Sequence, residues 1–160
     1  MGIFIDIYPY DGLGDTRREA RQLGLRGDRI SSLCYQASRE HFAIETTTSP
    51  LRKLIKRPVY MICKALGKER FQDMLERLAN VRPYDSSRFV GCVIWLSWGE
   101  KDIYLRKWFD HYRYMPFEDY KFRVPAEYDT ILRHTYGDYM QLPPEKDRQG
   151  HHYYTAYRKL

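Results

Sequence analysis

The fold is decided by Gly2-Ile3-Phe4-Ile5-Asp6-Ile7-Tyr8-Pro9, a stretch close to the start of the 160-residue chain. β-Branched and aromatic residues dominate it and Pro9 ends it, so it predicts a buried strand. A carboxylate inside such a strand is costly unless it is paired or binds a metal. Asp6 is therefore a candidate catalytic or metal-binding residue. The structural alternative is an aspartate that caps the following turn or faces water at a sheet edge.

The remaining sequence predicts a single α+β domain over residues 1–160, with a helix-rich middle, a short sheet and a hairpin. Turn residues follow the first strand at 10–15, and three apolar helical stripes follow at 30–44, 51–66 and 71–78, with a kink expected at Pro58. Strand-like residues 88–98 and 103–109 flank turn-forming residues 99–102 and predict the hairpin. An extended piece at 117–124, a helix from Pro125 to about His134 and an ordered loop at 136–152 complete the expectation.

Composition limits the classes of partner and the compartment. The net charge is +6, which favours anionic partners, and the 15 tyrosines suit a groove for sugars, nucleobases or choline-like cations as well as an ordinary core. The three cysteines, Cys34, Cys63 and Cys92, each lie in an apolar stretch and are expected to be reduced and buried. No apolar run is long enough to span a membrane. These features predict a cytoplasmic protein.

Three acid-x-acid pairs could in principle hold a metal ion. They are Glu100/Asp102 in the hairpin turn, Glu127/Asp129 at a helix N-terminus and Glu145/Asp147 in the proline-rich tail. None lies in an apolar strand, so each is expected to be a solvated pair. Asp6 therefore has no convincing acidic partner in this sequence.

The tail is the most unusual stretch. Tyr136-Gly137-Asp138-Tyr139-Met140 and Leu142-Pro143-Pro144 precede Arg148 and the pair His151-His152. Neighbouring histidines could supply a general base and a hydrogen-bond donor to phosphate, form half of a metal site, or simply lie on the surface near a terminus.

Both ends of the chain together resemble the LicD family of phosphotransferases. The resemblance rests on the opening strand with Asp11-Gly12, on Val124-Pro125 through Tyr128-Asp129 and Leu132, and on the tail motif that closes on His151-His152. It implies a partial nucleotidyltransferase-like fold, Mg²⁺, and a nucleotide-activated donor such as CDP-choline. Fukutin-type proteins, which use CDP-ribitol, are distant relatives of this family.

The resemblance also implies roles for individual residues. Asp6 falls on the third acid of the family site and would bind metal or orient the acceptor hydroxyl. Arg148, His151 and His152 would contact phosphate or acceptor, and Tyr136 or Tyr139 would face the cationic choline. The family's glycine-rich turn and acid-x-acid strand would precede Met1, so the chain is expected to be a C-terminal part that does not transfer phosphocholine alone.

The implied function is transfer of phosphocholine, or a similar group, to a glycan hydroxyl in cell-surface polysaccharide synthesis. A non-catalytic remnant and a basic nucleic-acid-binding module are the alternatives, and no nucleic-acid-binding motif is present. Residues 51–62 place four basic residues beside an apolar helical stripe. Such a helix can lie on an anionic bilayer, which would bring the protein to the inner membrane surface, or it can pack in the core with a solvated basic edge.

Overall fold

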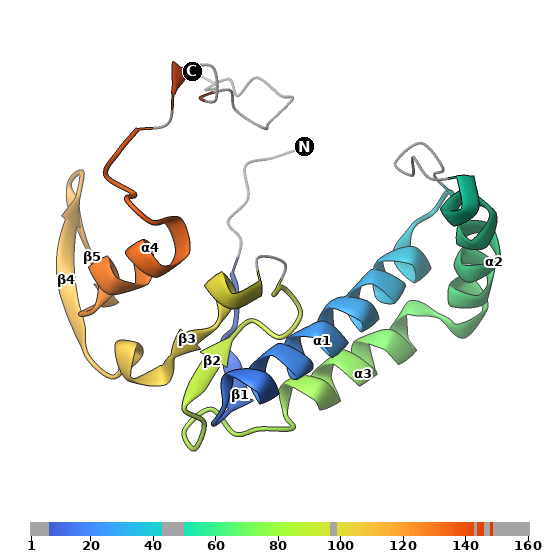
Figure 1. Ribbon diagram of the computed structural model, residues 1–160, viewed down its shortest axis with the longest axis horizontal. Coiled ribbons are helices and arrows are strands. Elements are labelled where there is room, and N and C mark those ends of the chain that lie inside the picture. Colours follow the sequence, from blue (N-terminus) through green and yellow to red (C-terminus); the bar gives the residue numbers. More distant parts are fainter. Residues whose placement is uncertain (1–6, 43–49, 97–98, 143, 146–147, 149–160) are drawn as a thin grey trace.

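The computed structural model describes residues 7–42, 50–96, 99–142, 144–145 and 148. Their architecture is α+β, as the sequence predicts, with four α-helices and two small antiparallel sheets. In Figure 1 the helices Arg17–Ser38, Pro50–Leu66 and Lys68–Ala79 lie on one side, and the sheet that contains Asp11–Gly14 and Phe89–Gly91 lies beside them. The hairpin of Tyr112–Phe117 and Tyr120–Pro125 lies with the helix Tyr128–Tyr136 on the other side. Among the described residues, no helix is long and apolar enough to cross a membrane.

Among the described residues, the first strand begins at Asp11. Residues 7–10 have no regular secondary structure, and Ile7 is 88% exposed. The described part of the expected strand, residues 7 and 8, is therefore neither extended in a sheet nor buried. The residues expected to form a turn contain β1 (Asp11–Gly14) instead. A Cβ at Gly12 would overlap the Arg82 carbonyl oxygen and the Ser87 hydroxyl. Glycine is needed at this position because the two backbone segments approach closely. Two of the four residues of β1 are glycine, so its sequence shows no alternation of apolar and polar side chains that would predict a strand.

The three-stranded sheet has the order β1-β2-β3, with β2 (Phe89–Gly91) antiparallel to β3 (Tyr104–Leu105). This pairing confirms the expected hairpin, although both strands are shorter than predicted. The 3₁₀ helix η2 (Arg106–Phe109) replaces the end of the second predicted strand, and residues 92–96 form turns or irregular structure. The predicted turn contains the 3₁₀ helix η1 (Gly99–Asp102). The core beside this sheet consists of Leu13, Ala20, Leu23, Leu78, Phe89, Val93, Leu96 and Ile103.

The helical middle is confirmed as α1 (Arg17–Ser38), α2 (Pro50–Leu66) and α3 (Lys68–Ala79). A second core joins them through Ala37, Cys63 and Phe71. α2 contains Pro58 and runs through it. Glycine lets α1 pass close to the segment after β2, since a Cβ at Gly27 would overlap the Val93 carbonyl oxygen.

The predictions for residues 117–134 need two corrections. The single extended piece is half of a hairpin, β4 (Tyr112–Phe117) and β5 (Tyr120–Pro125), whose turn contains Glu118 at φ 51°. Pro125 closes β5 opposite Tyr112, and α4 (Tyr128–Tyr136) begins after it. Both strands are largely exposed, so the alternation that would reveal β4 in the sequence is weak.

Candidate functional site

An aromatic pocket of about 280 Å³ lies where residues before β1, after β2, in β3 and in α4 meet. The residues that line it come from segments far apart in the sequence, so no local sequence motif predicts the pocket. They are Tyr8, Tyr10, Cys92, Trp95, Asp102, Tyr104, Thr135 and Tyr136. Of the residues predicted from the sequence for substrate binding, Tyr136 lies at this pocket.

Tyr104 fixes the geometry of the pocket. It is 6% exposed, and its ring stacks on that of Tyr10 with centroids 5.3 Å apart and an interplanar angle of 13°. Its hydroxyl lies 3.0 Å from the Thr135 hydroxyl, which in turn donates to the Ile131 carbonyl oxygen at 3.0 Å. Burial, with Tyr104 alongside, raises the pKa of Tyr10, so Tyr10 is a neutral phenol at physiological pH. The Tyr10 ring therefore presents a neutral π surface.

Two carboxylates lie at or next to the pocket. Asp102 is half-buried in the wall, whereas its sequence neighbour Glu100 is exposed and pairs with Arg17 at 2.8 Å. The expectation of one solvated Glu100/Asp102 pair is thus wrong for Asp102. The sequence feature that could have indicated the burial of Asp102 is its position directly before Ile103, an apolar residue that packs in the core.

Asp11, at the start of β1, is the second carboxylate. Burial raises its pKa, and the Val93 N–H, which donates to Oδ2 at 3.3 Å, partly opposes this effect. Burial also raises the pKa of the neighbouring Cys92 thiol, and the negative charges of Asp11 and Asp102 add to the effect. Cys92 is therefore a neutral, unreactive part of the wall.

Tyr139 does not share the aromatic pocket. Its hydroxyl donates to Asp129 Oδ1 at 2.8 Å, while Arg133 Nε donates to the other oxygen of the same carboxylate at 2.8 Å. These two hydrogen bonds lower the pKa of Asp129. Asp129 therefore stabilises α4 and the turn after it. Tyr136 is the tail tyrosine that reaches the pocket.

A second hollow, of about 570 Å³, adjoins the first through Tyr136. It is lined by Tyr136, Asp138, Gln141, Leu142, Pro144 and Arg148, so the structure brings Tyr136 and Arg148 to one place. In the loop expected at 136–152, Met140 and Leu142 are 73% and 72% exposed. Asp6, His151, His152 and Asp147 lie outside the described residues.

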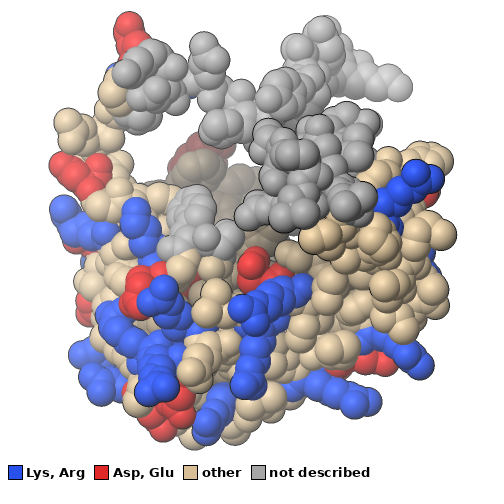
Figure 2. Space-filling model, turned by 45° about the vertical axis from the view of Figure 1, so that its right-hand side comes forward, with Lys and Arg blue, Asp and Glu red and all other residues tan. Residues whose placement is uncertain are grey.

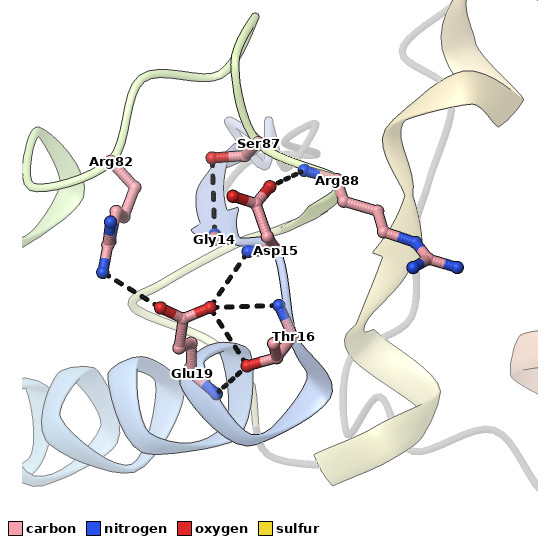
Figure 3. Close-up of polar contacts among 7 residues, drawn as sticks. All are labelled: Gly14, Asp15, Thr16, Glu19, Arg82, Ser87 and Arg88. Atoms are coloured by element: carbon pink, nitrogen blue, oxygen red, sulfur yellow. Dashed lines mark hydrogen bonds and ion pairs between the residues drawn. The ribbon is translucent and has the colours of Figure 1, made fainter.

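The carboxylates of Asp15 and Glu19 are structural (Figure 3). Glu19 Oε2 accepts hydrogen bonds from Asp15 N, Thr16 N and the Thr16 hydroxyl at 3.0–3.1 Å, and Oε1 accepts one from Arg82. Asp15 accepts one from Arg88 N at 3.1 Å. These bonds tie the start of α1 to the segment before β2, which gives both acids a structural role.

Within the described part of the chain, no group of three or more His, Cys, Asp or Glu side chains could hold a metal ion. Asp11 and Asp102 are two carboxylates flanking Cys92, a thiol that burial keeps protonated. These residues do not by themselves make the oxygen-rich set that Mg²⁺ prefers.

Comparison with known proteins gives one informative similarity. The chain is 26% identical over 156 residues to the lipopolysaccharide cholinephosphotransferase LicD of Haemophilus influenzae, a match that covers 97% of the chain. It spans 57% of the length of that relative. No family model and no solved structure matches. This distant similarity supports the resemblance of the sequence to the LicD family.

Proposed function

We propose that the chain is part of a cholinephosphotransferase-type enzyme that moves phosphocholine, or a similar group, onto a glycan hydroxyl in cell-surface polysaccharide synthesis. The observation that carries the proposal is the aromatic pocket with Asp102 in its wall, joined through Tyr136 to the hollow that contains Arg148. One part of this surface suits a cation and the other suits an anion.

The aromatic pocket has the chemistry that a quaternary ammonium group needs. Such a cation has no N–H to donate, so π faces and nearby negative charge must bind it. Tyr10, Trp95, Tyr104 and Tyr136 supply rings, and Asp102 supplies a carboxylate. At about 280 Å³ the pocket lies just below the size typical of drug-like ligands, which suits a small head group better than a whole nucleotide.

The adjoining hollow suits the phosphate of the same ligand. Arg148 presents a guanidinium, which binds phosphate oxygens through paired N–H donors. Because Tyr136 lines both hollows, a zwitterion of phosphocholine length would place its ammonium on one side of the ring and its phosphate on the other. The tail residues His151 and His152 are proposed to contact the phosphate or the acceptor beyond it.

In the proposed reaction, an acceptor sugar hydroxyl attacks the phosphorus that carries choline. A new oxygen–phosphorus bond forms as the hydroxyl gives up its proton to a general base or to water. The bond to the bridging oxygen of a donor such as CDP-choline breaks, and CMP leaves with the electron pair. Asp6 is the proposed residue for metal binding or for orienting the hydroxyl, within a partial nucleotidyltransferase-like fold. Mg²⁺ is the metal ion that the LicD resemblance implies for this reaction.

Binding can be tested without turnover by titrating choline into the protein by calorimetry. Choline is expected to bind about tenfold more tightly than its neutral isostere 3,3-dimethylbutan-1-ol, since a desolvated cation–π contact contributes about 1–2 kcal/mol. Asp102→Asn and Tyr136→Ala should weaken choline binding and leave the isostere nearly unaffected. Glu100→Gln and Tyr120→Ala, at exposed positions outside the pocket, are the matched controls. Equal affinity for the two ligands would contradict the proposal.

A further inference from the structure

Helix α2 has two apolar faces, and the described residues of the fold pack against one of them. Tyr60 and Cys63 face inward and are 8% and 2% exposed. The Tyr60 hydroxyl donates to the Glu40 carbonyl oxygen at 3.2 Å, and Lys64 Nζ donates to the Arg39 carbonyl oxygen at 3.1 Å. These contacts fix the rotation of the helix about its axis against the end of α1.

The opposite face is exposed although it is apolar. Ile55, Ile62 and Leu66 are spaced seven and four residues apart, so they share one side of the helix, and Met61 lies next to them. Their exposed fractions are 54%, 59%, 42% and 62% in the order Ile55, Ile62, Leu66, Met61. The sequence pattern predicts one apolar stripe along this helix, which includes Ile55, Ile62 and Leu66 but not Met61. In the structure only part of that stripe packs against the described core, and these residues lie on the exposed part. Scattered exposed apolar residues are ordinary, but a contiguous apolar face indicates a binding surface.

The charge of α2 has one sign. Residues 50–66 contain five basic and no acidic residues. Arg57 and Lys64, seven residues apart, form an exposed basic edge beside Met61. Figure 2, in which this side of the molecule comes forward, shows a broad uncharged surface with Lys and Arg dominating the charged areas near it.

A groove extends the apolar face toward α1. It has a volume of about 260 Å³ and is lined by Ser32, Leu33, Gln36, Ile55, Lys56 and Val59. Ile55 belongs both to the groove and to the exposed face of α2, so the two form one continuous surface.

From this arrangement we propose that the outward face of α2 docks on an anionic lipid surface, with its apolar residues at the acyl boundary and its basic edge among the head groups. An apolar stripe bordered by Lys and Arg is the pattern of helices that lie in a membrane interface. A second copy of the chain fits less well, because a two-fold contact through α2 would bring the basic edges of two chains, each of net charge +6, together. This inference is independent of the proposed activity.

The test is flotation of the protein with vesicles of equal parts phosphatidylcholine and phosphatidylglycerol, against vesicles of phosphatidylcholine alone. Binding is expected only to the anionic vesicles and should weaken as salt is raised. The double variant Ile55→Gln/Ile62→Gln should lower the partition coefficient at least about tenfold, since two apolar side chains lose their burial in lipid. Arg57→Glu should also lower it.

The matched controls are Leu25→Gln/Val81→Gln, which changes apolar residues of similar exposure outside α2, and Arg70→Glu on α3. Both should bind as the unchanged protein does, with circular dichroism confirming that every variant is folded. Three results would overturn the proposal: absence of binding to anionic vesicles, equal binding to neutral ones, or an equal loss in variants and controls. A dimer in solution that the α2 double variant converts to monomer, with vesicle binding unchanged, would assign the face to a second copy instead.

Discussion

The Tyr104 hydroxyl lies 3.0 Å from Thr135 Oγ1, and this buried contact joins β3 to α4 across the floor of the aromatic pocket. Tyr104→Phe removes it and is expected to lower the free energy of unfolding by about 1 kcal/mol. Thr135→Val should lower the free energy of unfolding by a similar amount. The double variant should lower it by less than the sum of the two single effects, because both changes remove the same hydrogen bond. Urea unfolding measures all three.

The control for this cycle is Tyr114→Phe, the same change at a residue that is 63% exposed on β4. It should alter the free energy of unfolding by no more than about 0.5 kcal/mol. Strict additivity of Tyr104→Phe and Thr135→Val would show that the two hydroxyls do not interact.

The close passage of α1 over the segment after β2 depends on Gly27. A side chain there would overlap the Val93 carbonyl oxygen, which is backbone and cannot move aside cheaply. Gly27→Ala is therefore expected to lower the free energy of unfolding by about 1–3 kcal/mol, despite the better helix propensity of alanine. Ser32→Ala, at an exposed position of the same helix, is the control and should be close to neutral. A stabilised Gly27→Ala protein would mean that α1 lies farther from Val93.

Glu19 should make the protein sensitive to acid. Its hydrogen bonds with Thr16, and then with Asp15, hold its pKa below the ordinary value of 4.5. A lowered carboxyl pKa contributes stability that is present above pH 4.5 and is lost as pH falls through the folded-state value. The unchanged protein should therefore lose stability below pH 4.5 more steeply than Glu19→Gln does. Chemical unfolding at stepped pH tests this, and Glu76→Gln on α3 should follow the unchanged protein.

Asp11 should act in the opposite direction. Burial raises its pKa above 3.8, so the folded chain holds this proton more tightly than the unfolded chain. The contribution of Asp11 to stability therefore falls as pH rises through 3.8 toward the raised value. In Asp11→Asn this decline should be absent, while Asp73→Asn, at an exposed position of α3, should retain it. A parallel pH dependence of the Asp11→Asn protein and the unchanged protein would show that the carboxyl is solvated.

The sequence predicts the α+β class, the helices and the β2–β3 pairing because each leaves a local pattern of apolar residues. It cannot reveal β1, whose Gly12 and Gly14 carry no side chain to pattern, or β4, which is exposed on both faces. Side chains decide a local period only when one face of the element is buried.

The candidate site is less predictable for a related reason. Tyr136 and Arg148 stand in a recognisable tail motif, and the structure brings both to the same hollow. Tyr10, Trp95 and Tyr104 look like ordinary aromatic residues in the sequence, because only the tertiary fold gathers them. In the sequence, Asp102 looks like one member of a solvated acidic pair in a turn. In the structure, Ile103 is buried and Asp102 lines the pocket.

The most direct test of the proposed site is a crystal structure of the protein with phosphocholine. We predict the trimethylammonium group among the rings of Tyr10, Trp95 and Tyr104, within about 6 Å of their centroids, with the phosphate beyond Tyr136 on the Arg148 side. Phosphocholine bound elsewhere, for example at Tyr139 or on the β4–β5 hairpin, with the aromatic pocket empty, would contradict the account.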